Sequence, residues 1–331
     1  MQIQYVEDDI LLTKLKRKVI VYTYMSYYKV LGFDKEPFST SPDPDFFYLS
    51  KEHETALTNI LIELRIKRGL SVILGDVGTG KTTLSRKLIQ ELKSRDDFIF
   101  HIILDPSFEN EQLFLSSLAK NFEINPARNS YGLSPAFDAQ APASLLDLRE
   151  ALERFLFQKG ITENKTVVII VDEAQKLSEN TIEILRVLLN YETNEFKLLQ
   201  LVLLGQLELY TKIMHIPNFF DRISFKYSLN PLDLDETKEM IQFRITQAGY
   251  RSTMQLFLDE AVKEIYQYTR GYPRRITMLC HRALKELILK NKFVIDGQLV
   301  REIIQSEIQA GWHRKDQLFE KNSYQGLRGE L

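Results

Sequence analysis

A glycine-rich stretch that ends in lysine and threonine carries the residue types that bind phosphate. Residues 75–82 read GDVGTGKT, which matches the pattern G-x4-G-K-[ST]. Glycines let such a loop curl so that successive backbone N–H groups point at phosphate oxygens. The lysine adds positive charge beside the β- and γ-phosphates, and the next hydroxyl can bind Mg²⁺. The pattern predicts an ATP site made by Gly75, Asp76, Val77, Gly78, Thr79, Gly80, Lys81, Thr82 and Thr83.

Two acidic residues, Asp172 and Glu173, directly follow the apolar run TVVIIV at 166–171. If that run is a strand of a parallel sheet, both carboxylates lie at the sheet's carboxyl edge beside the phosphate loop. We expect Asp172 to complete the Mg²⁺ shell with Thr82, and Glu173 to orient or deprotonate the attacking water. The long gap between the two motifs favours an additional strand between them and favours hydrolysis over phosphoryl transfer to a metabolite.

Three further polar residues occupy positions that suit contact with phosphate. Gln206 follows the apolar run LVLLG, so it is expected at the same sheet edge, near the water or the γ-phosphate. Arg222 precedes the strand-like run ISFKYSL, and Arg274 lies in GYPRRI at the start of a helical pattern. Arginine suits both places because its planar guanidinium binds phosphate oxygens and stays charged.

These residues need an α/β framework, and the sequence supplies its elements. Five apolar runs without polar alternation predict buried parallel strands, with helices between them on both faces. The expected strands are 71–74, 98–104, 166–171, 199–204 and 223–229. The expected helices are 52–68, 81–94, 110–122, 143–158 and 178–191.

After Pro231 the strand pattern ends and four amphipathic helices are predicted, at 235–248, 258–269, 274–290 and 296–310, with Asp235 and Asp296 as N-caps. We therefore expect an α/β nucleotide-binding domain at 25–230 and a small all-helical lid domain at 231–310. Residues 1–24 read as an extension, 125–142 as an insertion loop and 311–331 as a polar tail.

Composition narrows the class of protein. The 331 residues carry 43 Lys+Arg against 45 Asp+Glu, and 44% are hydrophobic, which fits a globular chain and excludes a histone-like or disordered one. A single cysteine excludes a disulfide framework, so a cytoplasmic location is expected. The apolar runs are strand-sized, so no integral membrane segment is expected.

The chain resembles the AAA+ ATPases in a set of motifs and in the helical lid that accompanies them. In chain order, these motifs are the phosphate loop, VVIIVDEAQ, LVLLGQLEL, FDRI and GYPRRI. The opening stretch at 27–50 is similar to that of ExeA-type (GspA-like) general-secretion ATPases, and TniB/TnsC-type transposition ATPases share much of this core. The resemblance implies that Gln206 is sensor 1, Arg222 an arginine finger acting on a neighbouring subunit, and Arg274 sensor 2. It also implies that the aromatic stretch containing Phe38, Phe46 and Phe47 covers the adenine.

The expected protein is an ATPase that forms a homo-oligomer, as a ring or filament, and remodels a partner. Two outputs follow from the resemblance. In the first, the partner is a protein of secretion or pilus machinery. In the second, the oligomer encloses double-stranded DNA, as a regulator of transposition or replication initiation, with Arg65, Lys67 and Arg68 as a candidate basic cluster.

Overall fold

The computed structural model describes residues 26–41, 43–125 and 143–311. They form two compact units. Of these described residues, 41 to 231 belong to the α/β unit, and 26–40 together with 232–311 belong to the helical unit. The predicted N-terminal extension, nearly all of the predicted insertion loop and the predicted tail from residue 312 lie outside the described residues.

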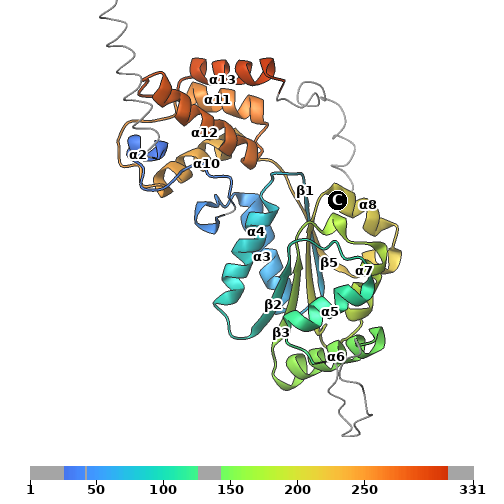
Figure 1. The fold of residues 1–331 in the computed structure, drawn as a ribbon. Coiled ribbons are helices and arrows are strands. Elements are labelled where there is room, and N and C mark those ends of the chain that lie inside the picture. Colours follow the sequence, from blue (N-terminus) through green and yellow to red (C-terminus); the bar gives the residue numbers. More distant parts are fainter. Residues whose placement is uncertain (1–25, 42, 126–142, 312–331) are drawn as a thin grey trace, which may run out of the picture. The chain divides into compact units, whose positions relative to one another are not determined.

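A five-stranded parallel sheet forms the centre of the α/β unit (Figure 1). Its strand order is β2-β3-β4-β1-β5. The strand that carries the phosphate loop (β1) is thus separated by β4 from the strand that carries the two acids (β3), which confirms the predicted additional strand. The five strands are β1 Leu70–Gly75, β2 Phe98–Ile103, β3 Thr166–Val171, β4 Leu199–Gly205 and β5 Ile223–Leu229.

Helices cover both faces of this sheet, which confirms the predicted α/β class (Figure 1). The central strands β1, β3 and β4 are buried along their whole length, and alternate residues join different hydrophobic cores. One core contains α3 Lys51–Arg65 and α4 Lys81–Lys93. The other contains α5 Glu111–Asn121, α6 Leu145–Phe157, α7 Glu179–Leu188, α8 Leu207–Met214 and α9 Pro217–Phe220.

Several short elements lack a sequence signal of their own. The 3₁₀ helix η1 spans Pro44–Phe46, the π-helical turn η2 spans Gln158–Thr162 and the 3₁₀ helix η3 spans Ala174–Lys176. Elements of three to five residues contain too few positions for an apolar period to appear. One of them, η3, directly follows the two acids and matters for the site.

The helical unit contains α2 Tyr27–Val30, α10 Leu234–Gln247, α11 Asp259–Thr269, α12 Pro273–Leu289 and α13 Gly297–Gln309. Asp296 caps α13 as predicted, because its carboxylate accepts the N–H of Leu299. The prediction of Asp235 as N-cap of α10 is wrong. Asp233 takes that position and forms a reciprocal capping box with Glu236.

The expected domain boundary differs from the structure at one side. Residues 27–40 were expected in the α/β domain, but they pack in the helical unit. Phe38 is 1% exposed and meets Phe257 edge to face. The buried Arg244 donates from Nε to the Pro37 carbonyl and from Nη2 to the Ser39 carbonyl, each at 2.8 Å. These contacts exclude Phe38 as a cover for adenine.

Candidate functional site

The phosphate loop has the backbone shape that its glycines were expected to give. Gly78 and Gly80 have φ of 89° and 102°, a region that side chains with a Cβ rarely adopt. Gly75 is required for a different reason, because a Cβ there would meet Thr79 Oγ1 at 2.7 Å. Val77 is exposed at the loop tip, whereas Thr79 is fully buried, donating its hydroxyl to the Asp76 carbonyl at 2.9 Å.

Lys81 begins α4 and turns its ammonium back into the loop. Its Nζ donates to the carbonyls of Gly75 at 2.7 Å and Asp76 at 2.9 Å. The side chain is 5% exposed. Burial lowers the pKa of Lys81, and the nearby charges of Glu173 and Asp172 oppose that shift. The Lys81 ammonium is buried beside the N-terminus of α4, where Thr82 and Thr83 also present backbone N–H groups. This combination of positive charge and N–H donors suits binding of a polyphosphate chain.

His53 contacts the backbone of the phosphate loop. This residue was not identified from the sequence. Its Nε2 lies 2.8 Å from the carbonyl of Thr79, and its Nδ1 lies 2.6 Å from Ser50 Oγ, at the N-cap of α3. A carbonyl only accepts, so Nε2 carries the proton and Nδ1 accepts from Ser50. Burial lowers the pKa of His53. Phe47 packs edge-on against its ring, so this part of the aromatic stretch lies beside the loop.

Asp172 and Thr82, the two residues expected to bind Mg²⁺, are hydrogen-bonded to each other at the sheet edge. Asp172 is 2% exposed, and burial raises its pKa, while a hydrogen bond with Thr82 opposes the shift. A carboxylate and a hydroxyl are hard oxygen donors of the kind that Mg²⁺ prefers. Across the described parts of the chain, no group of three or more His, Cys, Asp and Glu side chains could bind a metal. With one carboxylate and one hydroxyl, Asp172 and Thr82 fit a Mg²⁺ ion that takes its other ligands from substrate phosphates and water.

Glu173 lies directly beyond the strand in a left-handed backbone conformation, with φ of 51°. This conformation is costly for a residue with a Cβ and is typical of functional sites. Its Oε2 accepts a hydrogen bond at 2.7 Å from the amide of Gln175, in η3. Glu173 is half-buried, and its charge acts on Lys81. The structure thus brings the predicted base to the phosphate loop.

Gln206 follows β4 and precedes α8, at the same sheet edge. Leu74 of β1 pairs with Gly205, and Val171 of β3 pairs with Leu203, so the three strands end side by side. The Gln206 backbone N–H donates to Gln175 Oε1 at 3.1 Å. Glu208, two residues further on, adds another negative charge that acts on Lys81.

Arg222 lies at the opposite edge of the sheet. It precedes β5, whose first residue Ile223 pairs with Leu70, the first residue of β1. Six residues at about 3.3 Å each place this edge roughly 20 Å from the phosphate loop. The guanidinium donates to the Asn218 carbonyl and, at 2.7 Å, to Asn190 Oδ1. Arg222 therefore does not complete the site of its own chain.

Arg274 belongs to the helical unit, in the first turn of α12. It is exposed, whereas its neighbour Arg275 lies 4.5 Å from the centroid of the Tyr272 ring. Arg274 is the arginine of this pair that is open to a ligand, and its sensor role stays a prediction.

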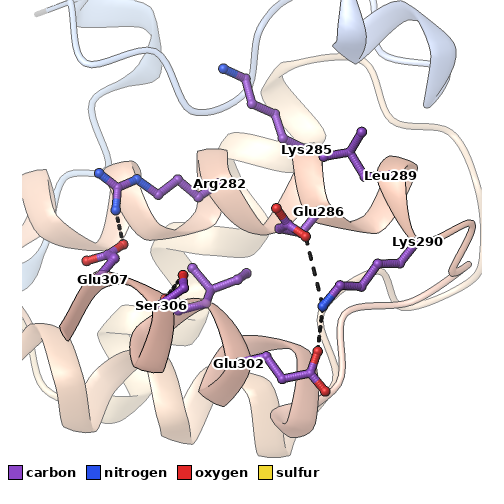
Figure 2. Close-up of a pocket in the computed structure, with 9 residues that line it drawn as sticks. Arg282, Lys285, Glu286, Leu289, Lys290, Glu302, Ser306 and Glu307 are labelled. Atoms are coloured by element: carbon purple, nitrogen blue, oxygen red, sulfur yellow. Dashed lines mark hydrogen bonds and ion pairs between the residues drawn. The ribbon is translucent and has the colours of Figure 1, made fainter. Parts of the chain in front are cut away.

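The helical unit also has a pocket of about 320 Å³ between α12 and α13 (Figure 2). Most of its charged residues pair with each other: Arg282 with Glu307, and Lys290 with Glu302 and Glu286. The ammonium of Lys285 lies instead 5.7 Å from the centroid of the Tyr27 ring. None of the predicted site residues lines it.

Among the described residues, no helix has the length and apolar content to cross a bilayer.

Comparisons with known proteins agree with this geometry. Residues 65–213 match the family model described as AAA domain. General secretion pathway protein A of Aeromonas hydrophila is 34% identical over 260 residues, which cover 78% of this chain but only 44% of that protein.

Two solved structures share the fold. The ORC2 protein of Aeropyrum pernix, solved in ADPNP-ADP complexes, has a TM-score of 0.54 at 19% identity, covering 78% of this chain and 67% of that one. Cdc6p of Pyrobaculum aerophilum has a TM-score of 0.57 at 16% identity, with coverage of 78% and 67%. The phosphate loop, the strand order, the family match and the solved structures together show that the chain has an AAA+ P-loop fold with an AAA domain at residues 65–213, and that it is similar to General secretion pathway protein A.

Proposed function

We propose that the protein is a Mg²⁺-dependent ATPase whose reaction takes place at the carboxyl edge of the sheet. The observation that carries the proposal is the meeting of three groups there. These are the buried ammonium of Lys81, the hydrogen-bonded pair of Thr82 and Asp172, and the carboxylate of Glu173. Each suits a different part of phosphoanhydride hydrolysis.

The chemistry follows from these positions. The loop N–H groups and Lys81 would bind the phosphate chain, and Thr82 and Asp172 would hold Mg²⁺. When bound, Mg²⁺ neutralises charge on the β- and γ-phosphate oxygens. Glu173 accepts a proton from water as the water oxygen attacks the γ-phosphorus in line. The bond to the β-phosphate oxygen breaks, and ADP and inorganic phosphate leave. Gln206 at the end of β4 suits contact with the γ-phosphate or the water.

Oligomerisation is part of the proposal. Arg222 lies at the sheet edge opposite the phosphate loop, so it can act on nucleotide only in a neighbouring copy. A ring or filament that stacks one edge on the other would bring Arg222 to the γ-phosphate of the next subunit. Arg274 would act as sensor 2 from the helical unit.

As the partner that ATP turnover remodels, we favour a protein of secretion or pilus machinery, and we propose that the protein works in the cytoplasm. The support is the 34% identity to General secretion pathway protein A. Duplex DNA is the alternative partner. Its candidate cluster at the end of α3 has exposed Arg65 and Arg68, but the Lys67 ammonium lies 4.3 Å from the centroid of the Phe196 ring.

The test is release of inorganic phosphate from ATP with Mg²⁺ or with EDTA. We expect Mg²⁺-dependent release that Asp172→Asn abolishes. Asp105→Asn, which changes an exposed carboxylate two residues after β2, serves as the matched control and should behave like wild type. Release that survives EDTA would contradict the proposal. Stimulation by duplex DNA, together with binding that weakens steeply with salt, would replace the protein partner with DNA.

A further inference from the structure

Gln175 connects two of the site residues through one side chain. Its Nε2 donates to Glu173 Oε2 at 2.7 Å, and its Oε1 accepts the backbone N–H of Gln206 at 3.1 Å. The first contact lies at the end of β3 and the second at the end of β4. One amide thus spans the carboxyl ends of two neighbouring strands.

The two contacts require both a donor and an acceptor from one side chain, which an amide provides. Glu173, when ionised, only accepts hydrogen bonds, and a backbone N–H only donates. A single side chain that serves both must therefore have a donor and an acceptor, and the Gln175 amide supplies them as Nε2 and Oε1. The chain also leaves room for it, because a Cβ at Gly205 would lie 3.3 Å from Gln175 Oε1.

The backbone of Gln175 is fixed as well as its side chain. Lys212, in α8, donates from Nζ to the carbonyl of Gln175 at 2.7 Å and to that of Leu177 at 2.6 Å. The short helix η3 is therefore attached to α8 at its backbone and at the Gln175 amide. Any displacement of the β4–α8 turn is transmitted to the group that contacts Glu173.

We propose that Gln175 is a positioning residue for Glu173 and links its carboxylate to the turn that carries Gln206. The proposal rests on the proposed ATPase function. Gln175 acts through Glu173 rather than on the nucleotide itself. It restricts the rotamers of the half-buried Glu173 so that the carboxylate faces the attacking water, and it couples that orientation to contact between Gln206 and the γ-phosphate.

The first experiment uses Gln175→Met, which preserves length and removes both hydrogen bonds. We expect kcat to fall roughly 10- to 100-fold, the loss typical of a misplaced catalytic group, with ATP affinity unchanged. Gln200→Met is the matched control. Gln200 is also an amide in the sheet that joins two backbone groups, the Gly69 N–H and the Lys197 carbonyl, but at the opposite edge. It should keep the wild-type kcat.

A second variant separates positioning from support of α8. Gln175→Glu keeps an acceptor for the Gln206 N–H but places a carboxylate against Glu173. If Gln175 only supports the turn, this variant retains activity. If it positions Glu173, kcat falls at least as far as in Gln175→Met while the melting temperature stays near wild type.

A double-mutant cycle gives the sharpest test. In the Glu173→Gln background, Gln175→Met should cause no further loss of kcat, because a residue that acts through another has no effect once that residue is removed. An independent further loss, or wild-type kcat in Gln175→Met, would overturn the inference. Absence of ATP hydrolysis by the wild-type protein would instead refute the proposed function.

Discussion

Lys81 and His53 show what local sequence can and cannot predict about the site. The phosphate loop was predicted because its chemistry depends on residues that are adjacent in the chain, and the spacing of glycines before Lys81 is visible directly. His53 contacts Thr79 across 26 residues, and Gln175 contacts Gln206 across 31. Such contacts depend on how α3 and η3 pack, so the sequence alone gave no reason to select either side chain.

At the residue scale, His53 makes stability depend on pH. Its pKa in the folded protein is lowered from 6.5 by burial. The unfolded chain therefore binds more protons as pH falls through about 6.5, so the free energy of unfolding decreases there. We predict that this decrease is shallower in His53→Gln, by up to about 1.4 kcal/mol per pH unit.

The measurement is urea unfolding at several pH values between 8 and 5. An equal slope in wild type and His53→Gln would show that His53 does not carry this dependence.

At the scale of elements, strands and long helices followed the sequence closely because their apolar periods extend over many residues. The predicted start of a helix was less accurate where it depended on choosing the N-cap residue. For α10, the N-cap is Asp233 and not the predicted Asp235. Residues 27–40 were assigned to the α/β domain instead of the helical unit, because the sequence of an extended aromatic stretch does not indicate which residues it packs against. Arg244, which binds the carbonyls of this stretch, lies more than two hundred residues away in the chain.

Gly271 makes a prediction at this scale. It has φ of +75°, and a Cβ there would lie 1.9 Å from the carbonyl oxygen of Leu232. Gly271→Ala should destabilise the helical unit by more than about 2 kcal/mol, from backbone strain and displacement of the α10 connection. Gly32→Ala, at φ of +82° with nothing within 4 Å, isolates the strain alone and should cost about 1 kcal/mol. Equal unfolding midpoints for both variants would contradict the packing argument.

At the scale of the whole molecule, the proposed role of Arg222 in a neighbouring copy would make activity a property of the assembly. We predict that Arg222→Ala binds ATP normally but turns over about 10³-fold more slowly. Mixing it with Glu173→Gln should restore activity at interfaces that join an intact Glu173 to an intact Arg222. Asn190→Ala, which removes the acceptor of Arg222 Nη2, should weaken turnover less. Verified mixed oligomers without recovery would exclude action in trans.

In the proposed ATPase, Lys81 and Glu173 lie at the same sheet edge but have different roles, Lys81 in binding ATP and Glu173 in cleaving it. The most direct measurement compares equilibrium MgATP binding and phosphate release in Lys81→Ala and Glu173→Gln. We predict that Lys81→Ala loses binding and therefore turnover. Glu173→Gln should bind ATP as wild type does and lose hydrolysis by about 10²-fold or more, since Glu173 acts only on the water. Tight ATP binding by Lys81→Ala, or wild-type turnover by Glu173→Gln, would contradict the account.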